Sequence, residues 1–195
     1  MSDLPVVTGS GGYVREAGPV MSLGGVARLA AELTRPANTT AYAANDLVGA
    51  NTSVSDTNVI EIENAVAAAG QALRIERVRL AKSTNVTTNA QFRLHVFESR
   101  PTLGVGDNGA LGDVAAGSFA VNAMRYYAGY VDVTINRAGN DTADGAVGVA
   151  VPAVGTGLTV APVSGTSIFL VIQALAAYTP ASNEVFWPVI EGIRG

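Results

Sequence analysis

Apolar residues recur at every second position over much of this chain, which is the period of a β-strand with one buried face. The alternation predicts strands in the runs 59–63, 92–96, 131–135, 147–151, 158–160 and 185–189. Residues 168–172 are apolar without a break and rich in branched side chains, so they predict a central strand buried on both faces. Because Pro188 cannot donate a backbone hydrogen bond, we expect the last strand at a sheet edge or a bulge.

One predicted strand contains two alternating pairs that are out of phase with each other. Leu73 and Ile75 would share one face of a regular strand, whereas Val78 and Leu80 would point to the opposite face. A β-bulge near Glu76-Arg77 adds one residue to the strand and would return all four side chains to the core face. We therefore predict a bulge at this position.

Turn-forming residues separate the predicted strands, at Gly106–Gly109, Ala138–Asp141, Asp144–Gly145, Gly155–Gly157 and Ser164–Gly165. Residues 103–128 are rich in alanine and glycine and have only weak periodicity, so we expect a long loop in which one helical turn is compatible with the sequence. Eight or so short strands with few long helices predict an all-β protein, an antiparallel β-sandwich.

The N-terminal part of the chain differs from the rest. Glycine and proline interrupt residues 1–28, so we expect an extended N-terminal arm there and a single β-sandwich domain at residues 29–195. Apolar residues within 24–34 have helical spacing, and a short helix ending at Arg35-Pro36 is one interpretation. A strand or an irregular arm segment fits the same residues equally well.

The composition narrows the possible functions. Only 14% of the 195 residues are charged, whereas an ordinary globular domain carries about 25%. The chain contains no cysteine, one histidine (His95) and one lysine (Lys82), which excludes a disulfide scaffold, a cysteine nucleophile and a multi-histidine metal site. The net charge of −4 gives no electrostatic footprint for nucleic acid or an anionic membrane, so we expect neither as a partner. With no secretory signal and no apolar run of bilayer length, we expect a soluble protein made in a cytoplasm.

Few residues could carry catalysis. His95 shares a strand face with Arg93, and the positive charge of Arg93 lowers the pKa of a nearby histidine. A general base is therefore not favoured. We expect either a half-exposed histidine on the strand or a histidine that forms an intersubunit hydrogen bond. Glu61 and Glu63 share another face, where a glycan hydrolase would place one of its two acids. We favour carboxylates that are solvated or paired with arginine instead. The expected partners are the arginines of the neighbouring predicted strand, Arg74, Arg77 and Arg79.

A loop with the sequence Asn140-Asp141-x-x-Asp144-Gly145 offers oxygen ligands, but it lacks the alternating spacing of a calcium loop. A turn rich in residues that tolerate unusual backbone angles explains it better. We therefore expect no catalytic residue, no metal site and no cofactor, and the chain is predicted not to be an enzyme.

An aromatic cluster is the preferred candidate for a binding surface. Tyr126, Tyr127 and Tyr130 follow Arg125, and aromatic residues together with arginine are enriched at interfaces. Arg93 and His95 are further interface candidates. Buried packing between the sheets explains the tyrosines about as well.

Two segments resemble structural proteins of tailed bacteriophages. The first segment carries Arg-Pro, Thr-Thr-x-Tyr and Asp-Leu-Val-Gly elements that recur in those proteins in this order. Its sequence is Thr34-Arg35-Pro36-Ala37-Asn38-Thr39-Thr40-Ala41-Tyr42-Ala43-Ala44-Asn45-Asp46-Leu47-Val48-Gly49. The second segment is similar to one that accompanies the first in the same phage proteins. Its sequence is Phe92-Arg93-Leu94-His95-Val96-Phe97-Glu98-Ser99-Arg100-Pro101-Thr102, followed by Asp107-Asn108. The resemblance covers roughly residues 30–110.

This resemblance implies a virion component, most similar to a capsid decoration (cement) protein with a jelly-roll fold. It implies a homotrimer on the capsid surface that binds the major capsid protein, and it transfers no catalytic or cofactor-binding residue. The alternative is a tail-associated jelly-roll module that binds a receptor or a carbohydrate through the Tyr126–Tyr130 region.

Overall fold

The computed structural model describes residues 7–8, 12–13, 25–111, 119, 121–141, 144–152 and 157–195. Their regular secondary structure is almost exclusively β. The strands are β1 (Val7–Thr8), β2 (Gly12–Tyr13), β3 (Val26–Ala30), β4 (Leu33–Thr34), β5 (Leu47–Val48), β6 (Ile60–Ile62), β7 (Leu73–Lys82), β8 (Gln91–Phe97), β9 (Tyr127–Thr134), β10 (Arg137–Ala138), β11 (Ala146–Ala150), β12 (Leu158–Val160), β13 (Ile168–Ala174) and β14 (Val185–Arg194). A 3₁₀ turn, η1 (Asp56–Asn58), and one short helix, α1 (Val121–Arg125), complete the elements.

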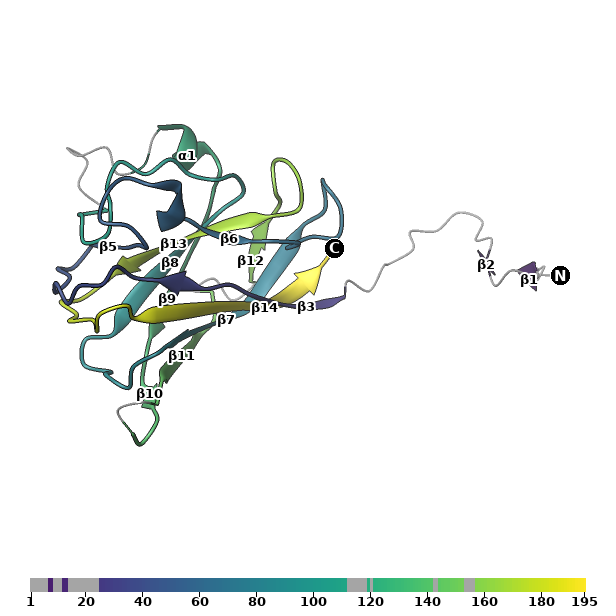
Figure 1. Cartoon of the computed structure of the whole chain (residues 1–195). Coiled ribbons are helices and arrows are strands. Elements are labelled where there is room, and N and C mark those ends of the chain that lie inside the picture. Colours follow the sequence, from purple (N-terminus) through teal and green to yellow (C-terminus); the bar gives the residue numbers. More distant parts are fainter. Residues whose placement is uncertain are drawn as a thin grey trace.

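Two antiparallel sheets lie one over the other (Figure 1). The seven-stranded sheet has the order β10-β11-β7-β14-β3, with β12 also paired to β7 and β4 also paired to β14. The five-stranded sheet has the order β5-β13-β8-β9, with β6 also paired to β13. Strands β1 and β2 pair with each other. The predicted all-β antiparallel sandwich is therefore confirmed.

The predicted bulge in β7 is also confirmed. The pairing of β14 with β7 shifts register between Glu191 and Gly192, which lie opposite Arg77 and Ile75. Glu76 is the additional residue, and the four apolar side chains on either side of it are all buried: Leu73, Ile75, Val78 and Leu80. The phase mismatch in the sequence is thus absorbed by one bulge.

The expected edge or bulge at Pro188 is wrong. Strand β14 lies inside the sheet, between β7 and the β3–β4 pair, and the β7 bulge lies opposite Glu191 and Gly192 rather than Pro188. The Pro188 carbonyl accepts a hydrogen bond from Ala31 N (3.1 Å), so this part of its backbone faces the interruption between β3 and β4. An interior strand tolerates proline here because the missing N–H falls where the neighbouring strand is broken.

The residues around the expected arm boundary form strand β3. Val26 pairs with Ile193, and Arg28 pairs with Glu191 on β14, so residues 26–28 belong to the sandwich. The strand interpretation of residues 24–34 therefore holds, and the helical one is wrong. The rest of the expected arm lies outside the described residues, apart from β1 and β2.

The main core lies between the two sheets. Phe92 belongs to this core and makes edge contacts with Tyr178 and Phe186, with ring centroids 5.3 and 5.2 Å apart. A second apolar cluster lies on the other side of the five-stranded sheet, where Phe97 and Val171 pack against side chains from the long segment after β8. Within the described part of that segment, α1 is the single helical turn that the sequence allowed. No helix of the described residues is long and apolar enough to span a membrane.

Candidate functional site

The structure brings together four of the predicted interface residues, on β8 and β9. Arg93 lies opposite Asp132 and donates two hydrogen bonds to its carboxylate, from Nε (2.7 Å) and Nη2 (2.9 Å). The Arg93 guanidinium also lies 3.9 Å from the ring centroid of Tyr130, which is 41% exposed. The hydrogen bond to Asp132 raises the pKa of Arg93. Arg93 and Tyr130 thus form a cation–π pair at the surface, with the guanidinium held in place by Asp132.

His95 is buried beside this group rather than half exposed, and its partners lie within the same chain. The Nδ1 and Nε2 atoms lie 3.1 Å from the Tyr127 hydroxyl and from Gln173 Oε1, respectively. Because an amide oxygen only accepts, Nε2 carries the proton and Nδ1 accepts from Tyr127. Burial lowers the pKa of His95 to about 4, and the nearby charge of Arg93 adds to this effect. His95 is therefore a neutral structural side chain near neutral pH.

The members of the predicted aromatic cluster differ in their exposure. Tyr127 is half-buried, its ring lies 5.2 Å from that of Phe97, and burial raises its pKa to about 12. Arg125 is exposed at the end of α1, with its guanidinium 5.7 Å from the ring of half-buried Tyr126. The three tyrosines therefore present one exposed ring, that of Tyr130, and not an aromatic strip.

The carboxylates considered for catalysis have structural surroundings. Glu61 forms an ion pair with Arg100 and not with the expected arginines of β7, because β6 pairs with β13 in the opposite sheet. Glu63 is exposed. In the 140–145 loop, Asp141 N donates to Asp144 Oδ2 (3.0 Å), as in a turn; residues 142 and 143 lie outside the described residues. Among the described residues, no cluster of three or more histidine, aspartate or glutamate side chains is placed to hold a metal ion.

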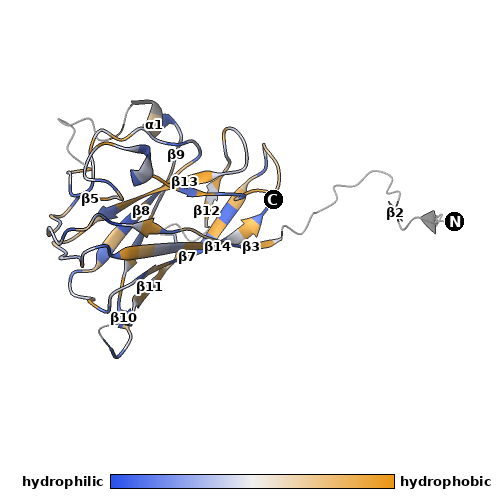
Figure 2. Ribbon diagram, in the orientation of Figure 1, coloured by the Kyte–Doolittle hydropathy of each residue, from blue (hydrophilic) through white to orange (hydrophobic). Residues whose placement is uncertain are grey.

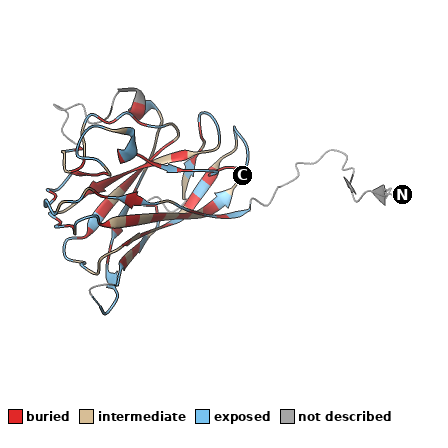
Figure 3. Ribbon diagram, in the orientation of Figure 1, coloured by how far each residue is buried: buried red, intermediate tan, exposed pale blue. Residues whose placement is uncertain are grey.

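A second candidate surface, which sequence reasoning missed, is the side of the seven-stranded sheet turned away from the other sheet. We call it the outer sheet face. Strands β3, β7 and β14 alternate between buried and more exposed positions along their length (Figure 3). The side chains directed outward are Val26, Arg28, Ala30, Arg74, Arg77, Arg79, Val147, Val149, Trp187, Val189, Glu191 and Ile193, with Val151 beyond the end of β11.

Glu191 is the charged centre of the outer sheet face. It accepts hydrogen bonds from Arg77 and forms a second ion pair with Arg79 (Nη2 to Oε1, 3.1 Å). On its other side it lies opposite Arg28 of β3. The hydrogen bond from Arg77 lowers the pKa of Glu191, and the charges of Arg79 and Arg28 lower it further.

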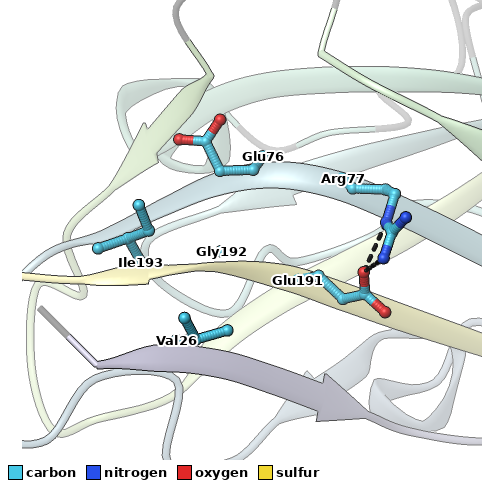
Figure 4. Close-up of a pocket in the computed structure, with 6 residues that line it drawn as sticks. All are labelled: Val26, Glu76, Arg77, Glu191, Gly192 and Ile193. Atoms are coloured by element: carbon cyan, nitrogen blue, oxygen red, sulfur yellow. Dashed lines mark hydrogen bonds and ion pairs between the residues drawn. The ribbon is translucent and has the colours of Figure 1, made fainter.

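A shallow hollow of about 290 Å³ lies next to this charged centre (Figure 4). Val26 of β3 and Ile193 of β14 line it, together with Glu76 and Arg77 of the bulge. Gly192 forms its floor. An added Cβ on Gly192 would lie 2.2 Å from the carbonyl oxygen of Arg74, so the close approach of β7 and β14 at the bulge requires glycine.

Apolar side chains are unusually exposed on the outer sheet face. Val26 is 89% exposed, Val151 67% and Val149 54%. Figure 2 shows that hydrophobic and hydrophilic residues are mixed along the strands of this sheet. The valines of β11 point outward because β11 packs tightly on β9: an added Cβ on Gly148 would lie 2.3 Å from the carbonyl oxygen of Thr134. Only small residues fit on the inner side of β11, so the larger ones face solvent.

The sequence matches no protein-family model and no curated protein.

Proposed function

We propose that this chain is a structural protein of a tailed-bacteriophage virion that binds the major capsid protein as a homo-oligomer and thereby decorates and stabilises the capsid. One observation carries the proposal. Arg35 and Asp107, one from each part of the sequence that resembles phage structural proteins, form an ion pair (3.0 Å) with both side chains fully buried.

The surrounding hydrogen bonds join these two parts of the chain into one unit. The Tyr42 hydroxyl donates to Asp107 Oδ1 (2.5 Å), and Gly49 N donates to the same oxygen (2.9 Å). The Arg35 guanidinium also donates to Tyr42. The residues that carry the resemblance therefore serve one buried network, as expected for similarity that reflects a common fold rather than chance composition.

The buried polar side chains also favour a structural role, because they bind one another within the described residues. His95, Lys82, Glu184 and Asp107 are buried, and each is hydrogen-bonded within the chain. The outer sheet face, in contrast, presents apolar side chains and arginines, the residue types found at protein interfaces. A subunit repeated over a shell needs only modest individual contacts, because many of them act together.

The proposal is tested with shells of the major capsid protein assembled without this chain. Purified chain is added, and the shells are collected by sedimentation and imaged by cryo-electron microscopy. We expect the chain to sediment with the shells and to give repeated density on their outer surface. Shells without added density, or density of this chain confined to the tail of the complete particle, would contradict the proposal.

The tail-associated, carbohydrate-binding function is the second candidate, and the exposed ring of Tyr130 is the observation that favours it. An aromatic ring held in place by Arg93 can stack on a sugar. A glycan array probed with the wild-type chain and with Tyr130→Ala tests this function. Binding that the substitution abolishes would favour it over decoration.

A further inference from the structure

Strand β3 forms an open edge of the seven-stranded sheet. It pairs with β14 on one side, and no described strand pairs with it on the other. Near the other end of the same sheet the sandwich is closed, because Gly148 of β11 packs against the backbone of Thr134 next to it. The edge at β3 therefore presents backbone groups that a further strand could bind.

The register of β3 against β14 shows which of these backbone groups face outward. Arg194 N donates to Gly25 O, and Ala31 N donates to Pro188 O, both over 3.1 Å. Because successive residues of a strand direct their backbone groups to opposite sides, the odd-numbered residues of β3 bond to β14 and the even-numbered ones do not. The N–H and C=O groups directed away from β14 are those of Val26, Arg28 and Ala30.

An extended segment of chain is the ligand that fits such an edge, because its own N–H and C=O groups repeat at the same spacing. A second copy of β3 fits poorly. Antiparallel pairing along the full edge would place Arg28 directly opposite Arg28 of the other copy, and like charges in this position destabilise a sheet. The edge therefore favours a segment with a different sequence.

The charges around the edge specify one side chain of that segment. Arg28 lies in the middle of β3, is exposed and forms no ion pair with any described residue. Glu191, opposite it on β14, already binds Arg77 and Arg79, so three guanidinium groups share one carboxylate. A carboxylate opposite Arg28 on the added strand would form a cross-strand ion pair and balance this excess of positive charge.

The first residue of β3 specifies a second side chain. Val26 is 89% exposed and lies beside Ile193 of β14 at the hollow (Figure 4). Residues two apart on a strand share a face, so a side chain two positions from the carboxylate would lie opposite Val26. An apolar side chain there would cover Val26 and extend the apolar surface of the hollow.

We infer that β3 binds an extended segment of the major capsid protein by strand addition, with a carboxylate opposite Arg28 and an apolar side chain opposite Val26. The inference rests on the proposed function and assigns the part of this chain that contacts the shell. Main-chain hydrogen bonds would supply the attachment, and the two side chains would select the segment.

Binding of the full chain to shells of the major capsid protein, measured by sedimentation over a range of chain concentrations, tests the inference. Ala30→Pro removes an outward N–H, and an edge strand tolerates proline. We expect it to weaken shell binding about tenfold, the effect of one lost hydrogen bond, whereas Ala30→Val keeps the N–H and should bind like the wild type. Arg28→Ala should also weaken binding, and Arg137→Ala, which removes an exposed arginine at the other end of the sheet, should not.

Hydrogen exchange gives an independent measurement on the wild-type chain. The chain is exchanged while bound to shells, released under quench conditions and read by NMR. The Arg28 amide should exchange more slowly on shells than in the free chain. The Leu29 amide faces β14 in both states and is the internal control.

Each other outcome overturns the inference. If Ala30→Pro and Arg28→Ala both bind shells like the wild type, or if the Arg28 amide is not protected there, this edge does not hold the capsid segment. An Ala30→Pro variant that loses self-association in sedimentation velocity but still binds shells would show that the edge holds a second copy instead. Circular dichroism establishes that each variant is folded. A wild-type chain that does not bind shells overturns the capsid function as well, whereas equal binding of wild type and variants overturns this inference alone.

Discussion

The Nζ atom of Lys82 lies 2.9 Å from Oε1 of Glu184, and both side chains are fully buried in the sandwich. The Tyr178 hydroxyl lies 2.7 Å from each oxygen of the same carboxylate, and Thr84 contributes a further hydrogen bond. Burial lowers the pKa of Lys82, and the interaction with Glu184 opposes this effect. The only lysine of the chain is therefore held as a buried cation by one carboxylate.

Replacing this lysine should strongly destabilise the fold. Lys82→Met leaves the Glu184 carboxylate buried without its counter-charge, and we expect the free energy of unfolding to fall by about 3–5 kcal/mol. Urea unfolding followed by tryptophan fluorescence measures the change. The control is Arg74→Met, which removes the exposed ion pair with Glu76 and should cost less than about 1 kcal/mol. Equal, small losses in both variants would contradict the predicted importance of the buried pair.

The single histidine gives a direct test of burial. Its imidazole should titrate in NMR spectra with a pKa of about 4, well below the ordinary 6.5. Between these two pH values the unfolded chain binds a proton that the folded chain does not, so stability is lost as the pH falls through this window. At about 1.4 kcal/mol per pH unit, the loss from His95 amounts to about 3 kcal/mol.

Other groups titrate in the same range, so the histidine contribution is isolated by a variant. His95→Gln cannot take up a proton, and the difference in unfolding free energy between wild type and variant should change with pH only between about 6.5 and 4. A difference that is constant over this window, or an NMR pKa near 6.5, would show that the imidazole is accessible to water.

The fold was predictable from the sequence to the extent that local pattern determines it. Alternation located the strands, and the two out-of-phase pairs in β7 located the bulge before any partner strand was known. The position of Pro188 was not predictable, because an interior proline depends on the interruption between β3 and β4, more than 150 residues away in the chain.

The candidate surfaces were less predictable than the fold. Arg93, His95, Tyr127 and Tyr130 were each interface candidates in the sequence, but their meeting was not predictable, because it depends on the pairing of β8 with β9. The outer sheet face was missed because alternation in β11 does not say which side is buried. Gly148 decides this through its contact with β9, a tertiary constraint that no local pattern contains.

Removing one hydroxyl from the buried Arg35 network should loosen the segments it joins. Tyr42→Phe keeps the ring but removes the donor to Asp107 and the acceptor for Arg35, and we expect a loss of about 1–3 kcal/mol. Hydrogen exchange should become faster at Gly49, whose amide donates to the same carboxylate. Tyr126→Phe is the control, because its hydroxyl makes no hydrogen bond to the described residues. Unchanged exchange in Tyr42→Phe would mean that the network does not hold these segments together.

The bulge beneath the hollow supplies the last prediction, on Gly192→Ala. The added methyl group would lie 2.2 Å from the Arg74 carbonyl oxygen, which belongs to the backbone of β7 and cannot rotate away. Either the two strands separate or the bulge shifts, and we expect a loss of about 1–3 kcal/mol in urea unfolding. Gly25→Ala is the matched control, because a Cβ there meets nothing within 4 Å; it should change stability by less than about 1 kcal/mol. If Gly192→Ala is as stable as Gly25→Ala, the two strands are not in tight contact at the bulge. The hollow beside Glu191 would then be a deformable surface rather than a fixed one.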